Sequence, residues 1–172
     1  MNVLLHPSAA LKHVAAPVDP TTETDLRDLC QTMARIMYDA PGIGLAAPQV
    51  GVLKRVIVYD LEDDGRPIAL CNPEIVEFGE ERDVDEEGCL SLPGISVPIE
   101  RSVTVVCEAL SLNGKRVRID AEGLHARVLQ HEIDHLDGVL IIDRATPEDR
   151  KAALVRYREA LDLGAKPGQT SI

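Results

Sequence analysis

The segment His131-Glu-Ile-Asp-His135 carries two histidines four positions apart, with a glutamate beside the first. Apolar residues recur at helical spacing around it, at positions 124, 128, 129, 133 and 136, so we predict a helix over residues 121–136. Residues four apart lie about 40° apart around a helix axis, and both imidazoles can therefore share a metal ion. The carboxylate of Glu132 can reach a water molecule on that ion. The alternative is a charged helix that carries two histidines without a metal role.

A catalytic metal ion needs a further ligand, since open sites typically use three protein ligands and a water molecule. Cys89 is the best candidate, because it lies in segment 86–93, which contains a glycine and ends in a proline. A divalent cation favours a thiolate over a thiol. The alternative is a buried cysteine in a tight turn. The other cysteines, Cys30, Cys71 and Cys107, lie within apolar patterns without any Cys-x-x-Cys motif, so we predict small buried side chains and no disulfides.

Two further helices are predicted to frame this chemistry. Apolar residues at three- and four-residue spacing predict an amphipathic helix over residues 24–39, which ends before Pro41. Thr146-Pro147 is typical of a helix start with a capping threonine and a first-turn proline, and this last helix is predicted to end near residue 163. The glycine- and alanine-rich segment 41–48 fits neither a stable helix nor a regular strand.

Runs of β-branched and apolar residues predict strands between the first two helices. They cover residues 55–60, 68–71, 74–79, 101–110 and 115–120. Asn113-Gly114 is a strong hairpin signal before the last strand, whereas segment 83–98, with two prolines and two glycines, predicts loop and short strand. We find no internal repeat or linker, so we expect one α+β domain over residues 1–165 and a frayed tail over residues 166–172.

Composition limits the classes of function. The chain has 172 residues, 45% of them apolar, and a formal net charge of −11. This is typical of a soluble globular protein, and the acidic surface argues against a direct nucleic-acid function. Aromatic residues make up only 2%, so the core must consist of valine, isoleucine, leucine and alanine. We see no membrane span and no signal peptide in the sequence, and we expect a cytoplasmic protein without a membrane role.

Three separated segments resemble the signature motifs of peptide deformylases. They are Gly42-Ile-Gly-Leu-Ala-Ala-Pro-Gln49, Glu87-Gly-Cys-Leu-Ser91 and Gln130-His-Glu-Ile-Asp-His135, and their order and spacing also fit. The resemblance runs to about residue 160. It implies an α+β fold in which antiparallel strands wrap around a central helix bearing the His-Glu-x-x-His motif, with N-terminal and C-terminal helices. It also implies a hydrolase that removes the formyl group from the formyl-methionine of newly synthesised polypeptides and releases formate.

The resemblance assigns roles within the motifs. Cys89, His131 and His135 would hold one divalent metal ion, usually Fe²⁺ in this family, although the ligand types alone also suit Zn²⁺, Ni²⁺ or Co²⁺. Metal-bound water would attack the formyl carbon, with Glu132 as general base and then general acid. The backbone N–H of Leu90 and the side-chain amide of Gln49 would stabilise the charge that develops on the formyl oxygen.

The peptide would be bound by neighbours of these residues. Gly42 and Gly44 allow close approach of an extended peptide and can take positive φ, the alternative being simple turn formation. Ile43, Leu124 and Val128 are candidates for the methionine pocket. Leu124 and Val128 are equally compatible with core positions. Arg127 lies either at the rim of the pocket or on the surface as a solvated charge. The predicted substrate-binding residues are Gly42, Ile43, Gly44, Glu87, Gly88, Leu124, Arg127 and Val128.

The sequence does not decide the preference for residues beyond methionine or a contact with the ribosome. Some deformylases carry a basic residue after the cysteine motif, but segment 94–99 has none here, so the preference for residues beyond methionine is not predicted. The last helix carries Arg150, Lys151, Arg156 and Arg158. In some family members a basic C-terminal helix contacts the ribosome, and the alternative here is a solvated face balanced by acidic neighbours.

Two other functions compete with a deformylase. A His-Glu-x-x-His metalloprotease would need a downstream third ligand, for which Glu159 is the only candidate, and it would leave the cysteine motif unexplained. A non-catalytic metal- or peptide-binding protein would retain the scaffold, but nothing in the three motifs is degenerate.

Overall fold

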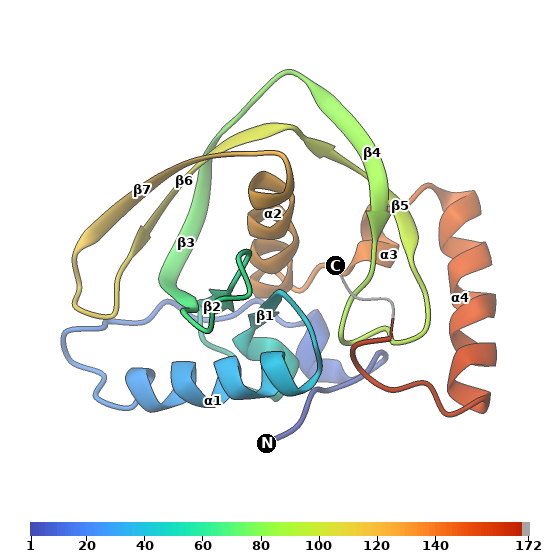
Figure 1. Ribbon diagram of the computed structural model, residues 1–172, viewed down its shortest axis with the longest axis horizontal. Coiled ribbons are helices and arrows are strands. Elements are labelled where there is room, and N and C mark those ends of the chain that lie inside the picture. Colours follow the sequence, from blue (N-terminus) through green and yellow to red (C-terminus); the bar gives the residue numbers. More distant parts are fainter. Residues whose placement is uncertain (170–172) are drawn as a thin grey trace.

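Antiparallel strands arch over one central helix in the computed structural model of the protein, which describes residues 1–169 (Figure 1). A five-stranded sheet has the order β1-β2-β3-β6-β7, and β4 and β5 form a separate two-stranded sheet. The strands are β1 (Gly44–Ala46), β2 (Val56–Tyr59), β3 (Ile68–Phe78), β4 (Arg82–Glu87), β5 (Val97–Ser102), β6 (Thr104–Leu110) and β7 (Arg116–Glu122). The helices are α1 (Leu26–Asp39), α2 (Leu124–Leu136), α3 (Ile141–Arg144) and α4 (Pro147–Asp162), with short 3-10 turns η1 (Ala9–Lys12) and η2 (Ala47–Val50). The predicted α+β class is confirmed.

The central helix α2 carries the two histidines and begins later than predicted. The sequence pattern placed its start at Ala121, but Ala121 and Glu122 pair with β6 as the end of β7. Gly123 then turns the chain with φ 59° and ψ −130°, a conformation that favours glycine. Every residue from Ala126 to Leu136 is buried, so the helix lies inside the protein rather than on its surface.

The outer helices match the prediction closely. The helix predicted over residues 24–39 corresponds to α1, and the one predicted from Thr146-Pro147 corresponds to α4. The Thr146 hydroxyl caps α4 by accepting a hydrogen bond from the N–H of Asp149. The short helix α3 was not predicted, because four residues are too few to show helical periodicity.

Several strand boundaries differ from the prediction. Segments 68–71 and 74–79 form one strand, β3, whose register to β6 is irregular near Asn72, which has φ 49°. Segment 101–110 is split, because β5 pairs with β4 whereas β6 pairs with β3 and β7. The glycine-rich segment forms the short strand β1 followed by η2, against the expectation of no regular structure. Long-range pairing, which local sequence does not record, decides these boundaries.

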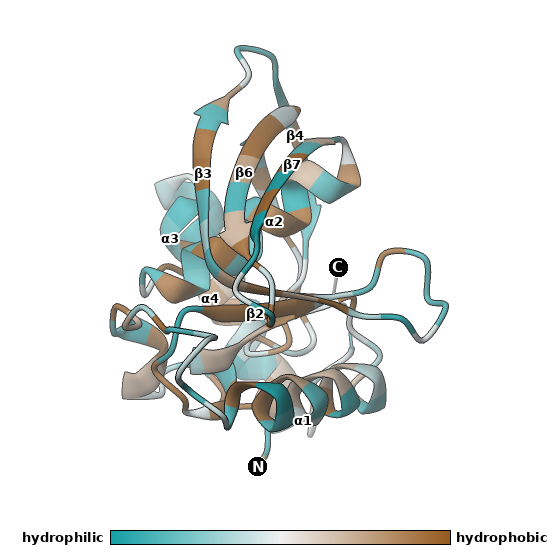
Figure 2. Cartoon of the chain, turned by 90° about the vertical axis from the view of Figure 1, so that its left-hand side faces the viewer, coloured by the Kyte–Doolittle hydropathy of each residue, from teal (hydrophilic) through white to brown (hydrophobic). Residues whose placement is uncertain are grey.

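The core is largely aliphatic, as the composition predicted. One buried cluster lies between the five-stranded sheet and α2, and a second beneath α1. A third lies between α3, α4 and the loop of residues 88–96 that carries Cys89, here called the cysteine loop. Every residue of β2 is buried, and α1 carries both hydrophilic and hydrophobic residues along its length (Figure 2). Its polar residues Arg27, Gln31 and Arg35 are exposed. Cys30, Cys71 and Cys107 are buried, as predicted, and their thiols are free. Within the described residues no helix is long and apolar enough to cross a membrane.

The end of the chain packs against the cysteine loop as far as it is described. The N–H of Gly94 donates to the carbonyl of Gln169 at 3.0 Å, and there is no room for a side chain at Gly94 beside Ala160 and Ala165. Residues 166–169 of the predicted frayed tail are therefore attached to the protein. Residues 170–172 of that tail lie outside the described residues.

Candidate metal centre

Cys89, His131 and His135 meet in the interior of the protein. Their ligand atoms lie within 4.8 Å of one another, and all three side chains are buried. The two histidines come from successive turns of α2, and the cysteine comes from the loop that follows β4. The Cys89 Sγ atom lies 3.4 Å from Nε2 of His135. The structure thus brings together the three residues that the sequence pattern and the resemblance assigned to a metal ion.

The surroundings of these side chains fit a divalent metal ion. Nδ1 of His131 lies 2.8 Å from a carboxylate oxygen of Glu87, which leaves Nε2 to face the centre. A carboxylate behind a histidine is the usual support of a metal ligand. Burial lowers the pKa of His135 well below its ordinary value, so its imidazole is in the neutral form that binds metals. One thiolate and two imidazoles suit iron, zinc, cobalt or nickel.

Glu132 lies beside the three ligands, and one of its carboxylate oxygens has no hydrogen-bond partner among the described residues. This oxygen, Oε2, is buried. Burial raises the pKa of its carboxyl group to about 7, and the nearby His131 opposes this shift. A carboxyl group with this pKa exchanges protons at neutral pH, which is what a general acid/base requires.

Gly42 and Gly44 are explained by close packing rather than by unusual backbone angles. Neither has positive φ, so the expected conformational freedom is not used. A Cβ atom on Gly44 would lie 2.5 Å from Oε1 of Glu132, and one on Gly42 would lie 2.8 Å from the side chain of Leu90. Any side chain at Gly44 would therefore displace the Glu132 carboxylate.

Gln49 is buried next to Cys89, and hydrogen bonds fix the orientation of its side chain. Its Oε1 accepts a hydrogen bond from the N–H of Ala46 at 2.9 Å, and its Nε2 donates to Oγ of Ser91 at 3.1 Å. Nε2 also lies 3.7 Å from Sγ of Cys89. A narrow cavity is lined by Gly42, Ile43, Gly44, Gln49, Gly88, Cys89, Leu90, Val128, His131 and Glu132. Leu124, the remaining methionine-pocket candidate, is half exposed at the start of α2 and is not among them.

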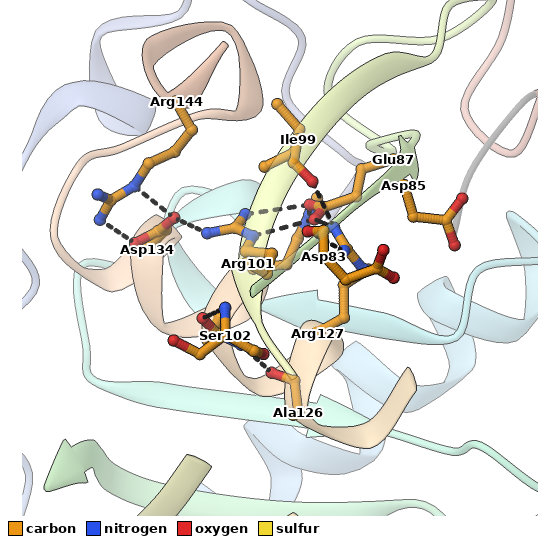
Figure 3. A network of polar contacts seen from close by, with 12 residues as sticks. Asp83, Asp85, Glu87, Ile99, Arg101, Ser102, Ala126, Arg127, Asp134 and Arg144 are labelled. Carbon is orange, nitrogen blue, oxygen red and sulfur yellow. Dashed lines mark hydrogen bonds and ion pairs between the residues drawn. The ribbon is translucent and has the colours of Figure 1, made fainter. Parts of the chain in front are cut away.

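Glu87 and Arg127 lie in a buried ionic network behind the histidines (Figure 3). Arg127 is buried and donates to Glu87 at 2.7 Å and to the carbonyl oxygens of Ile99 and Asp83. It is therefore neither a solvated charge nor a lining residue of the cavity. The predicted contact of these two residues with substrate stays a prediction. Their observed contacts support the position of His131.

The network continues through residues that the sequence reasoning missed. Arg101 contacts Glu87 with two nitrogens, at 2.9 and 3.0 Å, and Asp134 at 2.6 Å, and Arg144 also pairs with Asp134 (Figure 3). Burial would raise the pKa of Glu87, but hydrogen bonds from His131 and Arg101 outweigh it and hold that pKa well below its ordinary value. A signal was available in β5, where Val97, Ile99 and Arg101 alternate toward the interior, because an arginine at an inward position requires acidic partners.

Replacing Arg101 by methionine is expected to lower the free energy of unfolding by about 3–5 kcal/mol, because Glu87 and Asp134 would lose a buried cationic partner. Arg82→Met is the matched control on the neighbouring strand. Its ion pair with Glu100 is exposed, so that change is expected to cost less than about 1 kcal/mol. Urea unfolding of both variants with a chelator present separates this effect from metal binding. Equal losses in the two variants would contradict the assignment.

Comparisons with known proteins agree over nearly the whole chain. Residues 1–151 match the family model described as polypeptide deformylase. The peptide deformylase of Rhizobium meliloti is 44% identical over 168 residues, which cover 95% of this chain and 96% of that protein. That of Thermodesulfovibrio yellowstonii is 47% identical, covering 92% of this chain and 96% of that protein. The crystal structure of a peptide deformylase from Legionella pneumophila superposes with a TM-score of 0.88 at 40% identity and covers 94% of this chain and 95% of that one. The chain therefore belongs to the polypeptide deformylase family of hydrolases.

Proposed function

We propose that this chain removes the formyl group from the formyl-methionine of newly synthesised polypeptides, with Cys89, His131 and His135 as ligands of one divalent metal ion. The observation that carries this proposal is the convergence of the three ligand atoms beside the buried carboxylate of Glu132. A divalent ion held by them supplies Lewis-acid chemistry and lowers the pKa of water toward 7. The donor set suits Fe²⁺, Zn²⁺, Ni²⁺ or Co²⁺, and the family resemblance favours Fe²⁺.

Glu132 is the residue proposed to move the proton. Its carboxylate accepts a proton from water as the water oxygen bonds to the formyl carbon. The C–N bond then breaks, and Glu132 returns the proton to the departing amine, which leaves formate and a free N-terminus. A pKa of about 7, caused mainly by burial, suits both the accepting and the donating role.

The formyl oxygen is proposed to lie between two donors as it gains charge. Gln49 and Leu90 line the same cavity as Glu132, and the donors would be Nε2 of Gln49 and the backbone N–H of Leu90. Gln49 cannot rotate freely, because its Oε1 is held by the N–H of Ala46. Donors that are already oriented stabilise developing charge without reorganisation at the moment of reaction.

Replacing Gln49 by alanine is expected to lower kcat by about 10²–10³-fold, the usual effect of removing one such donor. KM is expected to change much less, because the formyl oxygen carries little charge in the ground state. Formate release measured at saturating substrate tests this, with the exposed Gln31→Ala variant on α1 as the control. A kcat within threefold of wild type would contradict the assigned role.

The peptide chain is proposed to enter along β1. Within residues 1–169 this strand lies at one end of the five-stranded sheet and pairs only with β2, so an extended peptide can add to its other edge. Ile43 and Val128 line the cavity beside this edge, and we propose them as walls of the methionine pocket. Leu124 stays a predicted contact.

The experiment that tests the function compares two activities of one preparation. Formate release from formyl-Met-Ala-Ser, measured anaerobically with defined metal ions, is expected, without cleavage of internal peptide bonds. Internal cleavage would instead support a metalloprotease. That alternative has lost support, because Glu159 is exposed on α4 and the metal-binding group found within residues 1–169 contains Cys89 in its place.

Contact with the ribosome through α4 stays a prediction. Two of its basic residues already contact the protein itself, since Arg150 pairs with Asp143 and Arg156 donates to the carbonyl of Ser96. The cytoplasmic location likewise stays an expectation.

A further inference from the structure

The N-terminal segment of residues 4–6, here called the N-terminal strap, joins the two loops that carry Gln49 and the cysteine motif. The N–H of Leu4 donates to the carbonyl of Gln49 at 2.7 Å, and the N–H of His6 donates to the carbonyl of Ser91 at 2.9 Å. The side chains of Gln49 and Ser91 are themselves bonded at 3.1 Å. The strap and the two residues therefore form a closed ring of hydrogen bonds around one side of the site.

Tyr157 of α4 attaches the strap to the rest of the protein. Its hydroxyl donates to the carbonyl of His6 at 2.9 Å, and its ring packs against the His6 ring with centroids 5.9 Å apart. Tyr157 is 5% exposed, one of two buried side chains of a helix whose other residues face outward or lie at intermediate depth. Both main-chain polar groups of His6 are thus occupied, one by α4 and the other by the cysteine loop.

We propose that Tyr157 is a positioning residue for the reaction, acting through His6 and Ser91 on the amide of Gln49. This inference rests on the proposed function, in which Gln49 donates to the formyl oxygen. The Ser91 hydroxyl accepts from Nε2 of Gln49, so the position of Ser91, together with the Ala46 N–H on Oε1, determines where that NH₂ group points. A shift of a few tenths of an ångström at a charge-stabilising donor slows the chemical step.

The strap has no regular secondary structure to hold it in place. Residues 4–6 belong to neither sheet, and the turn η1 begins only at Ala9. The contact with Tyr157 therefore replaces the support that a strand would obtain from its neighbours. Loss of the Tyr157 hydroxyl removes one hydrogen bond from this support and leaves the aromatic contact with His6 intact.

Tyr157→Phe is expected to lower kcat for formyl-Met-Ala-Ser by about three- to tenfold, with KM within twofold of wild type. The control is Tyr38→Phe, which removes a hydroxyl that donates to Asp60 and that forms no hydrogen bond with the strap within residues 1–169. Its kcat is expected to stay within twofold of wild type. A kcat for Tyr157→Phe within 1.5-fold of wild type would overturn the proposal.

A double-mutant cycle distinguishes positioning from general stabilisation. In the Gln49→Ala background, Tyr157→Phe is expected to have no further effect on kcat, because the donor that it positions is absent. If Tyr157 only supports the fold, the same fold-change appears in both backgrounds, and the proposal fails.

A readout independent of activity separates this inference from the proposed function. Hydrogen exchange at the N–H of His6 is expected to accelerate at least tenfold in Tyr157→Phe but not in Tyr38→Phe, and the NMR signal of the Gln49 side-chain amide is expected to shift. These changes are expected even if formate release fails in the wild-type protein, in which case only the proposed function is wrong. Unchanged exchange and an unchanged amide signal would overturn the positioning role.

Discussion

Replacing Glu132 by glutamine is expected to lower kcat by about 10²–10⁴-fold while the protein keeps its metal ion. Glutamine has the same shape but cannot accept a proton from water. The structure places the Glu132 carboxyl beside the ligand group without making it one of the three ligands, so metal binding has no need of it. The measurement is formate release combined with elemental analysis of the purified variant.

The control for this change is Glu122→Gln, at an exposed glutamate two residues before α2. It is expected to retain wild-type activity and metal content. Activity of Glu132→Gln within tenfold of wild type would remove Glu132 from its role. In the wild-type protein, activity is expected to fall as the pH drops, because a protonated carboxyl group cannot act as base. A bound cation lowers this pKa, so the fall is expected below pH 7.

The histidine pair could be predicted from sequence because helix geometry is local and fixed. A spacing of four places His131 and His135 on one face whatever the rest of the fold does. Cys89 could not be placed in that way, since it lies 42 positions before His131 in a loop without periodicity. The composition of its loop made Cys89 a candidate, the family resemblance joined the two segments firmly, and the structure then showed them in contact.

The contacts within the ionic network behind the histidines could not be predicted from the sequence, for a related reason. Asp134 and Arg144 each resemble ordinary surface charges when their own segments are read alone. The alternation in β5 indicates that Arg101 points inward, but it does not show which acidic residues are its partners. The three residues are buried or paired only because β5, α2 and α3 meet in the folded chain. The strand errors near Asn72 and Val103 have the same origin, since pairing between distant segments determined where the strands continue or break.

The local sequence also did not show which contacts its candidate residues make. Arg127 was singled out for its position on the helix, yet its partners are Glu87 and two backbone carbonyls from β4 and β5. Gly44 does not take the positive φ that was expected of it, and it leaves space for the Glu132 carboxylate, while its contact with a peptide stays a prediction. In both cases the neighbours that explain the residue lie more than 25 positions away in the chain.

Replacing Cys89 by alanine is expected to abolish stable metal binding. Two imidazoles would remain, and a divalent ion loses its single anionic ligand when the thiolate is removed. Metal content is measured by elemental analysis after dialysis. The wild-type apoprotein is expected to gain thermal stability when metal is added, because only the folded state presents the three ligands together, and the variant is expected to gain almost none.

The matched control is Cys107→Ala, which also shortens a buried cysteine but lies in β6 within the core between the sheet and α2. It is expected to lose stability through the small cavity that it creates, while retaining one metal ion per chain. The comparison separates a ligand from a packing residue, since both variants are destabilised but only one loses the ion. A Cys89→Ala protein that retains one tightly bound metal ion per chain would exclude Cys89 as a ligand, and the cysteine loop would then need another explanation for its approach to His135.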